Sequence, residues 1–138
     1  MTRSGTLARV VFDESHNEAW TIRPEVAGAM QPAHPSDASY ARAAAALASR
    51  DFVVVPNVEG PLTAERLAEC EVLVIAHPSD PAWERTTGTG SPRLSADELD
   101  AIEAFVAAGG GLVVLGETEQ EKYGNNLNEL LERFGLHL

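Results

Sequence analysis

Short apolar runs alternate with amphipathic segments along this chain. The runs are rich in β-branched residues, as strands buried on both faces are, and they cover residues 7–12, 52–55, 72–76 and 111–115. The segments between them place apolar residues at or near the helical spacing i, i+3, i+4, i+7. These predicted helices cover residues 40–47, 62–69, 95–106 and 127–134.

Capping residues support two of the predicted helices. Thr63 is the expected N-cap of the short second helix, and Ser95 with Glu98 forms an S-x-x-E capping box before the third. The glycines 109–111 then end that helix and lead into the next strand. Alternating strands and helices predict an α/β, flavodoxin-like three-layer sandwich with a parallel sheet of order 2-1-3-4.

The predicted connections are unequal in length. Loops that enter strands are short, whereas residues 13–37 and 77–94 form two long loops that leave strands. Loops of this length in a compact domain are usually functional or disordered, and open α/β sheets place ligand sites at the carboxyl ends of their strands. We expect residues 21–26 to cross the sheet edge in an extended conformation.

Composition narrows the class of protein. The 138 residues are enough for one domain with one core, and 44% hydrophobic with 22% charged residues is ordinary for a globular protein. A net charge of −11 repels phosphate backbones and anionic lipid, so we expect neither nucleic acid nor membrane as partner. No apolar run reaches the roughly 18 residues of a membrane span. The single cysteine, Cys70, suits a reducing, cytoplasmic location.

The last residues predict that the domain, residues 1–138, is cut from a longer protein. Residues 135–138 have the pattern of a helix C-cap followed by the first residues of a truncated fifth strand. A short edge strand that simply stops is the alternative.

The chain resembles a known superfamily in two stretches. Residues 94–138 combine a capped helix, Gly109-Gly110, an apolar strand, Gly116-Glu117, an Asn-rich helix start at 125–128 and a Leu-Leu-Glu ending. Together with the opening residues 10–20, this pattern resembles the class I glutamine amidotransferase-like superfamily. It is most similar to the non-catalytic branch, the GIFT-type domain of an intraflagellar transport subunit and related bacterial domains of unknown function.

The resemblance implies an amidotransferase fold without amidotransferase chemistry. Members that hydrolyse glutamine carry a nucleophilic cysteine on a strand-to-helix elbow, where this chain has residues 115–118, Leu-Gly-Glu-Thr. Cys70 precedes the third strand, at the opposite end of the sheet. A carboxylate cannot replace the thiolate, because it is a weak nucleophile whose acyl product is a labile anhydride. We therefore expect no glutaminase activity.

Polar residues follow three of the predicted strands. We expect these residues to line one ligand-binding crevice at the carboxyl ends: Asp13, Glu14, His16, Asn17, His77, Ser79, Asp80, Glu117, Thr118 and Glu119. Asp13, His16, His77 and Glu117 could serve there as ligands of zinc or another divalent ion, or as acid and base. We expect the rim carboxylates Asp13 and Glu117 to be exposed and to contribute little to stability.

Simpler interpretations of these residues stay open. Asp13 and Glu117 could cap helices, and His77 before Pro78 could be an ordinary loop residue in an extended conformation. Ser15, His16 and Asp13 are too close in sequence to predict a catalytic triad, whose members come from separate elements. Asn125 or Asn126 is expected to be the N-cap of the last helix.

Each long loop carries one tryptophan, Trp20 or Trp83. The indoles could pack on each other, but we expect them to flank the crevice and to favour a cation over their faces. The sequence thus predicts a non-catalytic, amidotransferase-like module with an acidic crevice, no required cofactor, and a protein partner or a neutral or cationic small molecule as ligand. The alternative is a metal-assisted or acid–base hydrolase that uses Asp13, His16, His77 and Glu117.

Overall fold

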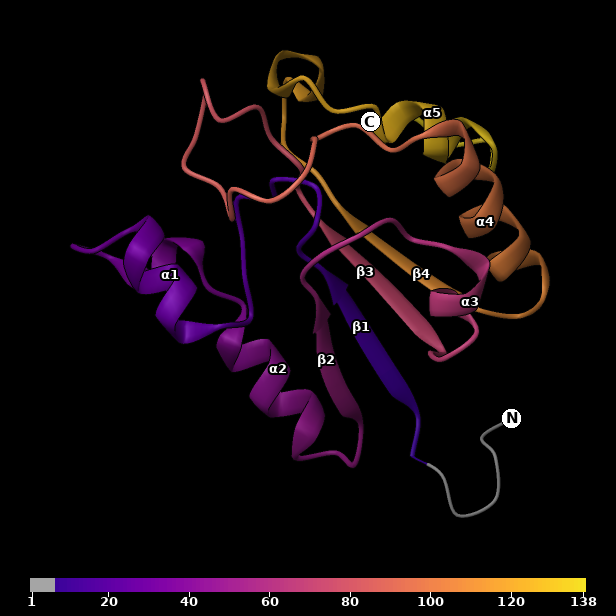
Figure 1. Cartoon of the computed structure of the whole chain (residues 1–138), viewed down its shortest axis with the longest axis horizontal. Coiled ribbons are helices and arrows are strands. Elements are labelled where there is room, and N and C mark those ends of the chain that lie inside the picture. Colours follow the sequence, from indigo (N-terminus) through magenta and orange to yellow (C-terminus); the bar gives the residue numbers. More distant parts are fainter. Residues whose placement is uncertain (1–6) are drawn as a thin grey trace.

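The computed structural model describes residues 7–138, apart from the side chain of Glu121, and contains a four-stranded, all-parallel sheet (Figure 1). Its strands are β1 (Arg9–Asp13), β2 (Val53–Asn57), β3 (Val72–Ala76) and β4 (Gly111–Leu115). The observed order, β2-β1-β3-β4, confirms the predicted fold class and strand order. Since the strands are parallel, all four carboxyl ends lie at one edge of the sheet, which we call the carboxyl edge.

Helices cover both faces of this sheet. The helices are α1 (Pro24–Met30), α2 (Ala41–Ala48), α3 (Ala64–Leu67), α4 (Ala96–Ala107) and α5 (Leu127–Glu132), with two short 3-10 turns, η1 (Pro35–Ala38) and η2 (Gln120–Tyr123). Figure 1 shows α2 on one side of the sheet and α3, α4 and α5 on the other, while α1 lies beyond α2, near the carboxyl edge.

Side-chain alternation along the strands divides the core between the two faces. Leu73 and Ile75 of β3 are fully buried and pack with Ile102 of α4 and Leu130 of α5. The intervening Val74 faces the opposite layer, where the partly buried apolar residues of α2 and β2 pack. The apolar pattern of β3 therefore reflects burial on both faces, as the sequence predicted.

The predicted caps are present. Thr63 Oγ1 accepts a hydrogen bond from Arg66 N, and Ser95 with Glu98 forms the complete capping box at the start of α4. Gly109 adopts a φ of 106° directly after α4, a conformation that favours glycine and lets the chain turn into β4.

Two local expectations differ from the structure. Residues 21–26 are not extended throughout, because Pro24 occupies the first turn of α1, where its missing N–H costs nothing. Residues 136–138 form no strand of the sheet. Within the described part of the chain, no helix combines the length and apolar character that crossing a membrane requires.

Candidate functional site

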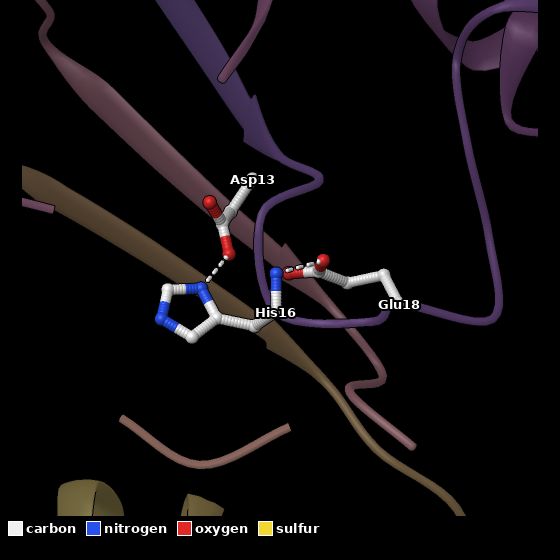
Figure 2. Close-up of side chains that lie close together, drawn as sticks. All are labelled: Asp13, His16 and Glu18. Carbon is white, nitrogen blue, oxygen red and sulfur yellow. Dashed lines mark hydrogen bonds and ion pairs between the residues drawn. The ribbon is translucent and has the colours of Figure 1, made fainter. Parts of the chain in front are cut away.

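The turn that follows β1 contains a cluster of buried polar side chains. Asp13, the last residue of β1, lies in register with Asn57 of β2, and Glu14 N donates to Asn57 O at 2.9 Å. The chain then reverses through Asn17, whose φ is 50°. This tight turn brings Asp13, His16 and Glu18 close together, as Figure 2 shows, and all three residues are buried.

Asp13 is fully buried and accepts several hydrogen bonds. Its Oδ1 accepts from Ser15 Oγ at 2.8 Å and from Asn57 Nδ2 at 3.0 Å, and its Oδ2 lies 2.5 Å from His16 Nδ1. Burial alone would raise the pKa of Asp13, but hydrogen bonds with Glu18, His16 and Asn57, together with the charge of His16, lower it to about 2. The expectation that Asp13 is exposed is therefore wrong, and the reason for expecting it to contribute little to stability no longer holds.

His16 links this turn to α4. Its Nε2 lies 2.8 Å from Oε2 of Glu98, and Glu98 is held in turn by Leu62 N on Oε2 and by Ser95 N on Oε1. Burial would lower the pKa of His16, but hydrogen bonds to Asp13 and Glu98 and the charges of both raise it to about 9. The buried imidazole is thus placed between two carboxylates.

Glu18 completes the cluster. Its Oε1 accepts from His16 N at 2.8 Å, whereas its Oε2 is buried and has no hydrogen-bond partner among the described residues. Burial, followed by the contact with Asp13, raises the pKa of Glu18 well above its ordinary value. Two carboxyl groups whose pKa values are shifted in opposite directions, that of Asp13 lowered and that of Glu18 raised, therefore lie next to each other in a closed space.

The loop 86–91, TTGTGS, covers this cluster. Thr87 N donates to Glu18 O at 2.9 Å, Asn17 N donates to Thr89 O at 2.8 Å, and Asn17 Nδ2 donates to Gly90 O at 2.5 Å. A side chain on Gly90 would overlap the carbonyl of Ser15, so only glycine permits this approach. The loop excludes solvent, and His16 is left only 4% exposed.

Ser15 meets both His16 and Asp13, although not as a catalytic triad. Ser15 Oγ lies 3.2 Å from His16 Nδ1, the same nitrogen that contacts Asp13. In a triad the serine and the carboxylate engage opposite nitrogens of the imidazole, and here Glu98 occupies the second nitrogen. Ser15 is therefore a hydrogen-bonding member of the buried cluster.

Glu14 also has an internal role. It is buried and accepts from Thr21 Oγ1 at 2.6 Å, from Ile22 N at 2.8 Å and from Arg23 Nε at 2.9 Å. These contacts fold the segment that leads into α1 back against the first turn.

His77, Ser79 and Asp80 form a second, separate set of contacts after β3. His77 Nε2 lies 2.8 Å from Glu84 Oε1, and its ring meets Tyr123 edge-on with 4.5 Å between centroids. Ser79 Oγ is 3.4 Å from Glu84 Oε1, and Asp80 Oδ1 accepts from Ala82 N. The alternative interpretation of His77 as an extended loop residue is wrong: its φ is 53°, although Pro78 follows.

Glu117, Thr118 and Glu119 are exposed after β4. They line a hollow of about 750 Å³ together with Gln120, Lys122 and Leu138. The structure therefore brings Asp13 and His16 together and places His77 and Glu117 in other surroundings on the same carboxyl edge.

The two tryptophans have different partners. Trp20 stacks on Tyr40 with 4.6 Å between centroids, whereas Trp83 is 60% exposed and lies below the ammonium of Lys122. Asn126 is the N-cap position of α5, but its side chain binds the backbone of Leu94, and Asn125 Oδ1 accepts from Leu127 N.

Sequence reasoning missed Glu18, Glu98 and Asn57 as members of the cluster. The pattern D-E-S-H-N-E at 13–18 carried a signal for Glu18, because four of its six side chains are charged or imidazole and fall in one short turn. Glu98 was recognised only as a helix cap, since nothing local indicates that its second oxygen reaches His16.

Comparisons with known proteins assign no family. No protein-family model matches the chain, and no curated protein matches it. What is established is the four-stranded parallel α/β sheet and its strand order.

Proposed function

We propose that this protein is a non-catalytic, amidotransferase-like module that binds a cationic or neutral group of a protein partner or small molecule. The binding surface is the acidic rim, which we define as Gly116, Glu117, Thr118, Glu119, Gln120 and Lys122, with Trp83 beside it. The strand order and the ligand preference of open α/β sheets for this edge support the proposal.

The observation that carries the proposal is that the rim already holds a positive charge of its own, the ammonium group of Lys122. The ammonium of Lys122 lies 3.1 Å from Glu119 Oε2, 5.7 Å from the ring centroid of Trp83 and 5.2 Å from that of Tyr123. A carboxylate and two aromatic faces thus already attract one positive charge in an exposed position, which is the arrangement that recognises ammonium and guanidinium groups.

Burial argues against chemistry at the other candidate groups. Asp13 and His16 are covered by the loop 86–91 and hydrogen-bonded within the cluster. Cys70 is buried at the amino end of β3, and burial followed by the charge of Glu71 raises the pKa of its thiol to about 11. We therefore favour binding over the hydrolase that would use Asp13, His16, His77 and Glu117 together.

A titration of ¹⁵N-labelled protein with a tri-arginine peptide tests the proposal, with a tri-glutamate peptide as the matched probe. We expect tri-arginine to shift the backbone amide signals of residues 116–122 and tri-glutamate to leave them in place. Glu117→Gln should weaken binding about two- to fivefold, which corresponds to the small energy of one exposed charge pair.

Two further variants sharpen this experiment. Lys122→Gln removes the internal competitor and should strengthen tri-arginine binding, whereas Glu65→Gln, at an exposed position of α3, should change nothing. Equal responses to both peptides, or shifts confined to residues outside the rim, would refute the proposal.

A further inference from the structure

We propose that Asp13, His16 and Glu18 bind one divalent transition-metal ion of the zinc class inside the turn that follows β1. One ligand atom from each residue lies within 4.8 Å of the other two, and the three side chains lie close together in Figure 2. All three residues are at most 4% exposed. The inference goes beyond the proposed function, which uses the exposed rim and not this closed cluster.

The unpartnered oxygen of Glu18 points to a missing ligand of positive charge. Glu18 is 0% exposed, and its Oε2 has no hydrogen-bond partner in the described part of the chain. A buried polar atom without a partner costs about 1–3 kcal/mol, and a charged group costs more. A cation held between Glu18 and Asp13 would satisfy this oxygen.

The second nitrogen of His16 is already fixed as a donor. His16 Nε2 lies 2.8 Å from Glu98 Oε2, and Glu98 is anchored by the backbone of Leu62 and Ser95. Histidines that bind metals usually donate their other ring N–H to a carboxylate in this way. The contact leaves Nδ1, which faces Asp13, as the metal-binding atom, and its proton is released when the metal binds.

Both carboxylates are anchored through one oxygen each. Asp13 Oδ1 accepts from Ser15 and Asn57, and Glu18 Oε1 accepts from His16 N. Of the other two oxygens, Glu18 Oε2 has no partner among the described residues, and Asp13 Oδ2 contacts His16 Nδ1 at 2.5 Å. Both can face the cation once His16 Nδ1 has released its proton. Such an outer set of donors orients the ligands before the metal arrives.

The charge balance of the cluster also calls for a cation. The carboxyl groups of Asp13 and Glu98 contact the imidazole of His16, and Glu18 contacts the backbone N–H of the same residue. His16 is the one cationic partner of these three carboxyl groups among residues 7–138, since no lysine or arginine there forms an ion pair with any of them. Buried carboxylates need such compensation. One imidazole with two carboxylates suits Zn²⁺ or Mn²⁺ better than Ca²⁺ or Mg²⁺, which prefer oxygen ligands alone.

The closed position assigns the metal a structural role. The loop 86–91 covers the site through Asn17 and the backbone of Glu18, so the metal would fix the turn on which this loop rests. Metal binding should therefore stabilise the fold and tighten the loop.

Metal content and metal-dependent stability test the proposal on the full chain, purified without a histidine tag. We expect about one equivalent of zinc or manganese by elemental mass spectrometry. After removal of metal with a chelator, added Zn²⁺ or Mn²⁺ should raise the melting temperature, whereas Ca²⁺ should not.

Glu18→Gln is the decisive variant, because it keeps the size of the side chain and the acceptor for His16 N. We expect it to fold and to bind Zn²⁺ at least tenfold more weakly, while Glu65→Gln, at an exposed position of α3, keeps the affinity of the native protein. A native protein without bound metal and without a response to Zn²⁺ or Mn²⁺ would overturn the proposal, as would a Glu18→Gln variant with unchanged Zn²⁺ affinity. The first result would mean that a proton, and not a metal ion, lies between Asp13 and Glu18. The second would mean that Zn²⁺ binds without Glu18.

Discussion

Asn126 binds the backbone of Leu94 with both atoms of its side-chain amide. Leu94 N donates to Asn126 Oδ1 at 2.7 Å, and Asn126 Nδ2 donates to Leu94 O at 2.8 Å. The pair joins the start of α5 to the residue that precedes the capping box of α4. A side chain placed to cap one helix thus fixes the entry to another.

Replacement of Asn126 should be costly for this reason. Asn126→Ala leaves the backbone N–H and carbonyl of buried Leu94 without their partners, and we expect the free energy of unfolding to fall by about 2–4 kcal/mol. Asn125→Ala is the matched control, since Asn125 is only half-buried, and it should cost about 1 kcal/mol. Urea denaturation of both variants measures the difference. Equal losses of unfolding free energy in the two variants would show that the contact between Asn126 and Leu94 contributes no additional stability.

Alanine substitutions at Gly88 and Gly90 distinguish the destabilisation caused by backbone conformation from that caused by close packing. Both have positive φ, 77° and 74°, but only a side chain at Gly90 would overlap Ser15. Gly88→Ala should therefore cost about 1–2 kcal/mol for conformation alone. Gly90→Ala should cost about 1–3 kcal/mol more, because the loop must move away from the cluster.

Hydrogen exchange provides the second measurement for the Gly90 variant. Amides of residues 15–18 should exchange faster in Gly90→Ala and stay protected in Gly88→Ala. Unchanged protection in both variants would contradict the assignment of the loop 86–91 as a cover.

The thiol of Cys70 should react slowly with alkylating reagents at neutral pH. Burial and the charge of Glu71 raise the pKa of its thiol from 9.0 to about 11, so the reactive thiolate forms only as the pH approaches 11. The preference for the protonated thiol stabilises the fold fully below pH 9.0, and this contribution is lost as the pH rises through 11. Alkylation by iodoacetamide at pH 8 should be much slower than for a free cysteine, and its rate should rise steeply toward pH 11.

The same residue tests the absence of amidotransferase chemistry. Native protein should release no ammonia from glutamine, and Cys70→Ser should bind tri-arginine as the native chain does. Ammonia release that disappears in Cys70→Ser would contradict this prediction.

The sequence was sufficient for the elements whose determinants are local. The β-branched run 72–76 coincides with β3, and the capping box at Ser95 marks the start of α4. Strand order followed from the chirality of parallel crossovers. The segment 21–26 was misjudged because Pro24 is compatible both with extended chain and with the first turn of a helix.

The candidate site was less accessible to sequence reasoning. The turn after β1 was recognised as polar, but its burial depends on residues 86–91, which approach only through Gly90. The alternative of an extended His77 was left open because proline follows, whereas contacts with Glu84 and Tyr123 accompany its left-handed conformation. The burial of the turn and the conformation of His77 both depend on contacts with residues outside their own segments of the chain.

The buried turn also has a consequence for the order in which the chain can fold. Residues 13–18 are among the first of the domain to leave the ribosome, yet their partners are Asn57, the loop 86–91 and Glu98. The carboxylates and the imidazole must therefore stay hydrated until α4 has been synthesised, because only then can water be replaced by protein. Local pairing of β1 with β2 can come early, but the corner around His16 can close only after α4 is present, because its contacts have long sequence separation.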